Sequence, residues 1–383
     1  MFNNCAQKKL IKYIKVIIMS KDQPNDPILE FLLKKHKFSF DSVLGKGGFG
    51  SVYSINVNEN NFAYKIVKVK KDLNSKELAE TIKSIEKEFS YAKILRGKYC
   101  IRTLSIFKDE DNKNPKIIAY SAVMEKALYS DLKYFIYYFY KGNLLHLNNY
   151  KKYFKKISHL NMMTIRFFAY QMIQSLDFLE NHNLCHCDFK PENFLITLGF
   201  IVKISDFSLL KVVEKNKNVK LTSSTWNIKA PEYFTEKKEV KAEDAIKVDV
   251  YGFGLILYYM LTNQYLLSSE DKEILSNRDK NKKEKYDYLK KKLDNKIKDI
   301  EKIEYADKGL KNLIIQTIQP EITKRPNVGD LLENDWVNEN MEELNQVYNI
   351  NDHEEIKLFI EFQKTSNNNP MKKKKKKKNK FNR

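Results

Sequence analysis

The hydrophobic pattern of this 383-residue chain is mainly that of strands in its first part and mainly that of helices in its second. Between Phe38 and Ile66, apolar and polar residues alternate over short runs, which is typical of β-strands. The residues from Asn58 to Asn61 predict a hairpin between two of these strands. From Asn161 onward, apolar residues recur at the three- and four-residue spacing of helices. We therefore expect an α+β protein, with a small β-rich lobe followed by a large α-helical lobe.

The charged segment 76–95 predicts one long helix in the β-rich lobe, because its apolar residues share one face: Ile82, Ile85, Phe89 and Ala92. Glu88 lies on that face, whereas Glu86 is directed toward solvent. Lys65 points inward from a predicted strand, and a buried ammonium group needs a counter-charge. Glu88 is the expected partner, and the pair can hold Lys65 against the α- and β-phosphates of a nucleotide.

A glycine-rich motif, Gly45-x-Gly47-x-x-Gly50-x-Val52, lies between two predicted strands. Residues without side chains let backbone amides approach phosphate oxygens and permit a tight turn. A dinucleotide-binding fold is disfavoured because a strand, and not a helix, follows the motif. A glycine-rich hairpin without a ligand is the alternative if the motif is taken alone.

The segment 186–193, His-Cys-Asp-Phe-Lys-Pro-Glu-Asn, places an acid, a cation and an amide in one short loop suited to phosphoryl transfer. Asp188 would accept the proton of the attacking hydroxyl, and Lys190 would neutralise charge on the transferring group. Asn193 would bind magnesium through its carbonyl oxygen, and Asp206, at the end of a short strand, would bind magnesium that bridges the phosphates. Either segment alone could be a polar surface loop, but their order after the glycine motif and Lys65 argues against that.

Together these motifs resemble the eukaryotic protein kinase family over roughly residues 38–337. Lys190 and Thr225 resemble the serine/threonine members. The resemblance implies a two-lobed protein kinase fold with an N-lobe at 38–124, a hinge at 125–128 and a C-lobe at 129–337. The flanking segments, 1–37 and 338–383, are then extensions. It also implies transfer of the γ-phosphate of ATP, with Mg²⁺ or alternatively Mn²⁺, to a serine or threonine hydroxyl of a protein substrate.

The resemblance further implies the remaining nucleotide contacts. Met124 would be the gatekeeper, and the Glu125 carbonyl and the Ala127 backbone would meet the adenine. The other expected contacts are Asp131 for the ribose, Val52, Ala63 and Leu195 around the adenine ring, and Leu44 beside the glycine motif. Outside the site, the resemblance assigns structural roles to a Glu232–Arg325 pair and to Asp249, which would anchor the catalytic loop.

Several residues depart from the family pattern. Cys187 replaces an arginine that usually pairs with a phosphate on the activation segment, which defines a non-RD kinase. We therefore expect activity that does not require phosphorylation of the residues Thr222, Ser223 and Ser224. Ser208 replaces a glycine after the magnesium-binding acid. These departures leave a second reading open, a pseudokinase scaffold that binds ATP with little or no transfer.

Glu192 lies where family members that prefer basic substrates bind an arginine upstream of the acceptor. One acid is thin support for a substrate class. A small buried thiol is the ordinary interpretation of Cys187, and no second pair of Cys or His residues stands at zinc spacing from the Cys185–Cys187 string.

The chain carries a formal charge of +20, and residues 371–383 contribute nine cations and no acid. This tail, Lys372 to Lys380, could be a nuclear-import address or could bind an anionic partner, namely nucleic acid, an acidic protein or a membrane surface. For the tail, the alternative is a solvated segment without a partner. For the protein as a whole, a further alternative is a basic nucleic-acid-binding protein whose kinase fold is incidental. Four scattered cysteines favour an intracellular location, cytoplasmic or nuclear. No apolar run reaches membrane-spanning length, so no transmembrane segment is expected.

Overall fold

The computed structural model describes residues 25–47, 50–128, 130–140, 160, 162–197, 200–221, 225–339 and 341. The basic tail, most of the C-terminal extension and the residues Thr222, Ser223 and Ser224 lie outside the described residues. Contacts divide the chain into two compact units. We call residues 25–95 and 102–126 the strand unit, and residues 96–101 and 127–341 the helical unit.

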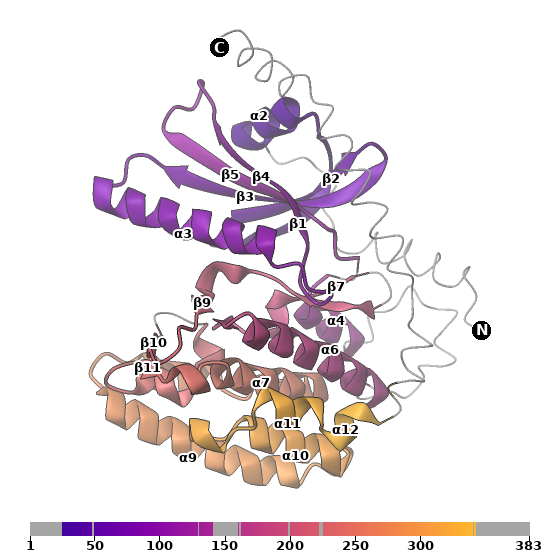
Figure 1. Ribbon diagram of the computed structural model, residues 1–383, viewed down its shortest axis with the longest axis vertical. Coiled ribbons are helices and arrows are strands. Elements are labelled where there is room, and N and C mark those ends of the chain that lie inside the picture. The colour runs from indigo at the N-terminus through magenta and orange to yellow at the C-terminus, as the bar shows by residue number, and fades with distance from the viewer. Residues whose placement is uncertain are drawn as a thin grey trace, which may run out of the picture. The chain divides into compact units, whose positions relative to one another are not determined.

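Within the described residues, five strands form the antiparallel sheet of the strand unit in the order β1-β2-β3-β5-β4 (Figure 1). Their bounds are Ser39–Gly47, Gly50–Val57, Asn60–Lys70, Thr103–Glu110 and Ile117–Met124 for β1 to β5. The predicted hairpin is confirmed, because Asn58 and Glu59 turn the chain between β2 and β3 with φ angles of 49° and 67°. Positive φ at both central residues gives a turn whose twist matches that of the flanking strands.

Two helices cover opposite faces of this sheet, as the alternation along β3 requires (Figure 1). Phe62, Tyr64 and Ile66 share a buried cluster with α2, Pro27–His36. Val67 and Val69, which follow at odd-numbered positions and so point to the opposite face, share a second cluster with α3, Ser75–Ile94, the helix predicted from the sequence. The expected buried face of α3 is confirmed at Ile85, Glu88 and Phe89.

Helix α2 belongs to the predicted N-terminal extension, yet its apolar side chains complete the core of the strand unit: Ile28, Leu29, Leu32 and Leu33. Asp26 caps the helix by accepting hydrogen bonds from the N–H groups of Ile28 and Leu29. Pro27 begins α2, where it is tolerated because proline has no N–H that would remain unpaired in the first turn. The folded part of the chain therefore begins before Phe38.

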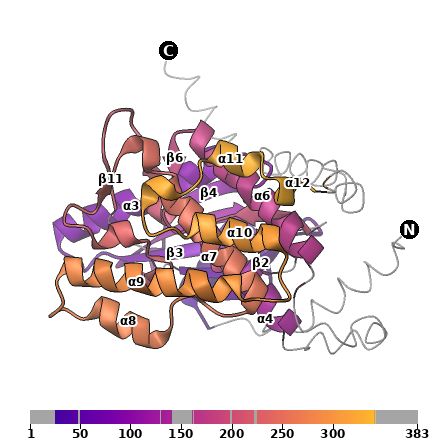
Figure 2. The same ribbon diagram turned by 90° about the horizontal axis from the view of Figure 1, so that it is seen from below.

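The helical unit is built around α7, whose residues from Lys247 to Leu261 are all buried. Figure 2 shows α8 lying beside α9 in this unit. The helices have the bounds Leu132–Tyr140 (α4), Met162–Asn181 (α6), Lys247–Thr262 (α7), Ser269–Ser276 (α8), Lys282–Glu301 (α9), Lys308–Thr317 (α10), Val328–Leu332 (α11) and Asp335–Asn338 (α12). The expected α+β fold, with a β-rich part followed by a helical part, is confirmed.

The segment Ala242–Thr262, which contains α7, is apolar and long enough to cross a membrane. Its apolar window is 94% buried inside the protein, as in the central helix of a folded domain. The described residues therefore indicate no transmembrane segment.

Short antiparallel pairs position the loops of the helical unit. They are formed by β6 with β9, β7 with β8 and β10 with β11, at Leu184–Cys185, Lys211–Val212, Phe194–Ile196, Val202–Ile204, Val219–Lys220 and Glu239–Val240. Residues 96–101, which lie between α3 and β4 in the sequence, also join this unit. The Ile101 N–H donates to the Ile204 carbonyl at 2.9 Å, which attaches this segment to β8.

Candidate active site

The strand unit holds Lys65 and Glu88 together, with 2.5 Å between Lys65 Nζ and Glu88 Oε1. Lys65 lies in the middle of β3, between Val52 on β2 and Ala122 on β5. Both charged side chains are largely buried, so each compensates a charge that would otherwise be costly to desolvate. Glu86, in contrast, has a half-exposed side chain. The buried pair fixes the ammonium group on the face of the sheet that α3 covers.

The described glycines of the motif lie at the adjoining ends of β1 and β2. Gly45 lies opposite Val52, and Gly47 pairs with Gly50. Gly50 has a φ of 135°, and a Cβ atom there would lie 2.4 Å from the Ile66 carbonyl oxygen. Both the backbone angle and this close approach require glycine.

The remaining nucleotide candidates of the strand unit lie on or beside the same strands. Leu44 is on β1, and Ala63 lies opposite Met124 at the end of β5. The Glu125 N–H donates to the Arg102 carbonyl at 3.0 Å, and Glu125 Oε1 accepts from the Arg102 N–H. These contacts fix the backbone that follows β5, where the hinge is predicted. Ala127 is the first residue after it that belongs to the helical unit.

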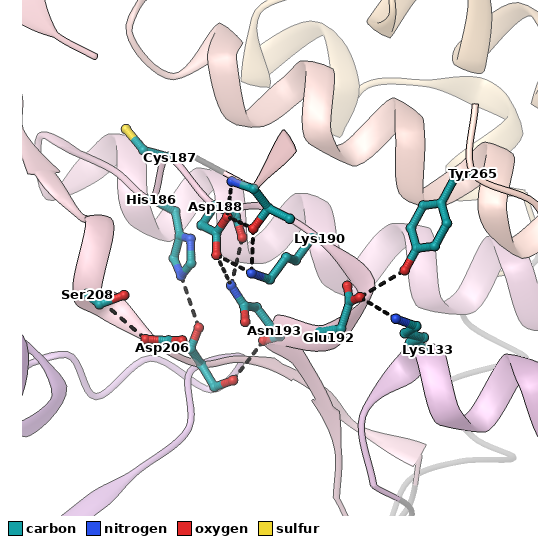
Figure 3. Close-up of polar contacts among 12 residues, drawn as sticks. Lys133, His186, Cys187, Asp188, Lys190, Glu192, Asn193, Asp206, Ser208 and Tyr265 are labelled. Carbon is teal, nitrogen blue, oxygen red and sulfur yellow. Dashed lines mark hydrogen bonds and ion pairs between the residues drawn. The ribbon is translucent and has the colours of Figure 1, made fainter. Parts of the chain in front are cut away.

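In the helical unit, the Asp188 carboxylate is held by three polar side chains (Figure 3). Lys190 Nζ lies 2.5 Å from Oδ2, and Asn193 Nδ2 donates to the same oxygen at 3.1 Å. Thr225 Oγ1 donates to Oδ1 at 2.8 Å and accepts from Lys190 at 2.7 Å. The structure thus brings together all four residues predicted to be catalytic. Thr225 and Asp188 are 37 residues apart in sequence.

Asp249, on α7, holds the loop that carries Asp188. The N–H groups of His186 and Cys187 donate to the two Asp249 oxygens at 2.5 and 2.8 Å. Burial raises the pKa of Asp249, and these donors oppose that shift by favouring the carboxylate. Gly252, one turn later on α7, permits this packing, because a Cβ atom there would lie 2.5 Å from the Phe189 carbonyl oxygen. His186 Nε2 also contacts the Ser205 carbonyl at 3.0 Å.

The hairpin of β7 and β8 places Asn193 and Asp206 at neighbouring strand ends. Phe194 pairs with Ile204, and the Ser205 N–H donates to the Asn193 carbonyl at 2.8 Å. Both amide hydrogens of Asn193 are directed to Asp188, so its side-chain oxygen is left for other contacts. Carboxylate and amide oxygens are suitable magnesium ligands. The donor set at these strand ends therefore fits a magnesium ion.

Asp131 and Leu195, predicted to contact ribose and adenine, are paired by an isolated bridge. Asp131 caps α4 by accepting from the Tyr134 N–H at 2.9 Å. Burial, together with the charge of Glu192, raises the pKa of Asp131 to about 6 despite this hydrogen bond. The carboxylate is therefore held in a weakly solvated position.

The two expected structural contacts are also present in the helical unit. Arg325 binds Glu232 through two parallel contacts, at 2.6 and 2.8 Å, and both side chains are buried. Bidentate pairing of this kind satisfies the charges of both groups away from water. It connects the segment after β10 to the segment before α11.

Cys187 is buried, and its Sγ lies 3.4 Å from Sγ of Cys185. The contact with Cys187 and burial both raise the pKa of the Cys185 thiol, which disfavours the reactive thiolate. Cys187 thus fills a site in the core with an uncharged group where the family resemblance predicts a cation.

Two residues that contact Glu192, namely Lys133 and Tyr265, could not be selected from the sequence. Glu192 Oε1 accepts from Lys133 Nζ and from the Tyr265 hydroxyl, both at 2.8 Å (Figure 3). Lys133 lies on α4, and Tyr265 follows α7. No local motif marks either of them, because their meeting depends on how separate helices pack.

Residues 38–337 match the family described as "Protein kinase domain". The chain is 27% identical over 243 residues to an Aurora kinase of Eremothecium gossypii, covering 63% of this chain and 57% of that protein. It is 29% identical over 237 residues to a carbon catabolite-derepressing protein kinase of Candida glabrata, covering 61% of this chain and 33% of that protein. A serine/threonine-protein kinase of Saccharomyces cerevisiae, HAL4/SAT4, is 26% identical over 306 residues, covering 77% and 45%. The matched region thus spans between a third and just over half of each relative.

Proposed function

Because this chain belongs to the protein kinase domain family, we propose that it transfers the γ-phosphate of ATP to a serine or threonine hydroxyl of a protein substrate. The observation that carries this proposal is the network around Asp188, in which Lys190, Asn193 and Thr225 orient one carboxylate. A polar loop without a catalytic role would have no need to gather these three groups on one acid.

In the proposed reaction, Asp188 accepts the proton of the acceptor hydroxyl while a bond forms between that oxygen and the γ-phosphorus, and the bond to the leaving ADP breaks. Lys190, which bonds to both Asp188 and Thr225, stabilises the negative charge of the transferring group. Lys65, fixed by Glu88, holds the α- and β-phosphates. Asn193 and Asp206 would hold Mg²⁺, which neutralises phosphate charge when bound.

The proposed choice of serine or threonine over tyrosine rests on Lys190 and Thr225. Both lie on the Asp188 carboxylate, as the resemblance to serine/threonine kinases implies. A relative whose name describes a serine/threonine-protein kinase supports the same assignment.

The test is label transfer from γ-labelled ATP with Mg²⁺, or with Mn²⁺ in its place, by the full chain and by Asp188→Asn. We expect the wild type to label itself or a generic protein substrate on serine and threonine, identified by phosphoamino-acid analysis. Asp188→Asn should lower the rate by about 10³-fold or more, because the hydroxyl loses its proton acceptor. ATP should still raise the melting temperature of this variant, since the groups that hold the phosphates are unchanged.

Two outcomes would contradict the proposal. Equal labelling by the wild type and Asp188→Asn would exclude Asp188 as the base. Absence of any transfer by the wild type, with ATP-dependent stabilisation retained, would instead support a scaffold that binds ATP without using it.

A further inference from the structure

Glu192 lies in the catalytic segment but takes no part in the proposed reaction. It is four residues from Asp188, so the two Cα atoms are at most about 14 Å apart. An extended peptide whose acceptor hydroxyl meets Asp188 advances about 3.3 Å per residue. A residue two to four positions from the acceptor therefore comes within reach of Glu192, and an unpaired carboxylate there would attract a cationic side chain.

The chain's own cation already occupies Oε1 of this carboxylate, while Oε2 is buried away from the surface. Lys133 Nζ and the Tyr265 hydroxyl both lie 2.8 Å from Glu192 Oε1, and Figure 3 shows them converging on it from one side. Lys133 also lies over the Tyr265 ring, 5.5 Å from its centre, and that ring stacks on Tyr259 at 4.8 Å. The ammonium group is thus held by a carboxylate and an aromatic face, and the same carboxylate oxygen accepts from the Tyr265 hydroxyl.

The arrangement is at the surface, where a substrate can reach it. The side chains of Lys133 and Glu192 are 41% and 31% exposed. A substrate arginine that displaced Lys133 would exchange one partly exposed ion pair for another, and such pairs differ little in free energy. The displaced ammonium group would remain close by and repel the arriving cation. An internal pair of this kind removes the advantage that Glu192 would offer to a basic peptide.

We propose that Lys133 is a specificity-determining residue, which by pairing with Glu192 makes the enzyme indifferent to arginine or lysine near the acceptor. Its substrates then need no flanking cation. The net charge of +20 acts in the same direction, because a basic protein attracts neutral or acidic partners over basic ones. This inference rests on the proposed kinase function, and it goes against the basic-substrate preference that Glu192 alone suggests.

The experiment compares labelled nine-residue peptides with a central serine and either alanine or arginine at positions two to four on each side. Binding to the full chain is measured by fluorescence anisotropy, and kcat/KM by phosphate transfer. We expect the wild type to discriminate between the peptides by less than about threefold. Lys133→Met, which keeps the length of the side chain without its charge, should bind the arginine peptides about tenfold more tightly than the wild type does.

Two matched variants separate charge from shape. Lys133→Arg keeps a cation beside Glu192 and should behave like the wild type. The double variant Lys133→Met/Glu192→Gln should lose the gain, because the freed carboxylate is then absent. Unchanged melting temperatures would show that each variant is folded.

The proposal is overturned if the wild type binds the arginine peptides tenfold more tightly than the alanine peptides and Glu192→Gln abolishes that preference. It is equally overturned if folded Lys133→Met binds both peptide sets as the wild type does. Because binding is measured without turnover, a failure of phosphate transfer would refute the kinase assignment separately and leave the role of Lys133 decided by anisotropy.

Discussion

Thr225 contributes one hydroxyl to two contacts at the proposed reaction centre. Its Oγ1 donates to Asp188 and accepts from Lys190, so it fixes the position of both groups relative to each other. A valine at this position keeps the β-branched shape but has neither contact. Misplacing a catalytic group lowers the rate of the chemical step more than it lowers nucleotide affinity.

We therefore expect Thr225→Val to lower kcat about 10- to 100-fold while KM for ATP changes by less than about threefold. Steady-state kinetics with Thr225→Ser as the control would show this, since serine retains the hydroxyl and should remain within about threefold of the wild type. A rise in KM with kcat unchanged would indicate a role in binding instead.

Asp131 gives the protein a predictable dependence on pH. Its pKa rises from 3.8 to about 6 on folding, mainly because the carboxyl is buried. A raised carboxyl pKa means that the folded state binds the proton more tightly than the unfolded state. The contribution of Asp131 to stability is therefore greatest below pH 4 and is lost as the pH rises through 6.

Asp131→Asn should remove this dependence while still accepting the hydrogen bond of the Tyr134 N–H. At about 1.4 kcal/mol per pKa unit, the variant should be about 3 kcal/mol more stable than the wild type at pH 8 and gain about half of that at pH 5. Urea unfolding at both pH values measures the difference. An equal gain at pH 5 and pH 8 would show that the carboxyl titrates normally.

Single residues were predictable where their chemistry is local. Asp188, Lys190 and Asn193 lie within six consecutive residues, so their order in the sequence already indicated their functions. The Lys133–Glu192 contact joins residues 59 positions apart, and the sequence around either residue does not predict the other as its partner. A charged side chain in a lysine-rich chain has many possible partners, and only packing selects one.

At the scale of elements, α2 extends the core of the strand unit beyond the region that matches the kinase family. Leu29 and Leu32 are fully buried against the sheet. Lys68, on β3, is connected to Asp26, the cap of the helix, by an ion pair of 2.5 Å. His36 and Lys35, at the other end of the helix, both contact Asp109 on β4. The helix is therefore bound to the sheet at both ends and along its length.

Leu29→Ala and Leu32→Ala should each lower the free energy of unfolding of the strand unit by about 2 to 5 kcal/mol, because each leaves a cavity in a closed core. Glu30→Ala, on the exposed face of the same helix, should stay within about 0.5 kcal/mol. Hydrogen exchange of the β2 and β3 amides, measured by mass spectrometry, follows this unit by itself. If exchange stayed as slow as in the wild type, α2 would be a dispensable addition.

The strands and α3 could be predicted because their hydrophobic periods are regular, whereas α2 was obscured by its flanking residues. Its buried positions, Ile28, Leu29, Leu32 and Leu33, do have helical spacing. The prolines at 24 and 27 break any long helix in this segment, so the sequence suggested an extension instead. Residues 96–101 were assigned to the N-lobe with their sequence neighbours for a different reason. Their pairing with β8 is a long-range contact, which no local pattern predicts.

For the molecule as a whole, the means of fixing the catalytic loop decides how activity can be regulated. The resemblance places an arginine at position 187 in kinases that are switched by a phosphate on the activation segment. Here the position holds a buried thiol beside Cys185, which has no charge to offer a phosphate. Asp249 holds the loop through the N–H groups of His186 and Cys187, and these contacts do not depend on any phosphate.

The variant with alanine at Thr222, Ser223 and Ser224 should therefore keep kcat/KM within about threefold of the wild type, because loop positioning needs no added charge. Asp249→Asn is the contrasting variant, since it weakens two charge-assisted hydrogen bonds and should lower kcat by about tenfold or more. Both are measured on protein treated with phosphatase, alongside its melting temperature. A hundredfold loss in the triple variant with its melting temperature unchanged would mean that a cation elsewhere in the chain replaces the missing arginine, and regulation by phosphorylation would then be retained.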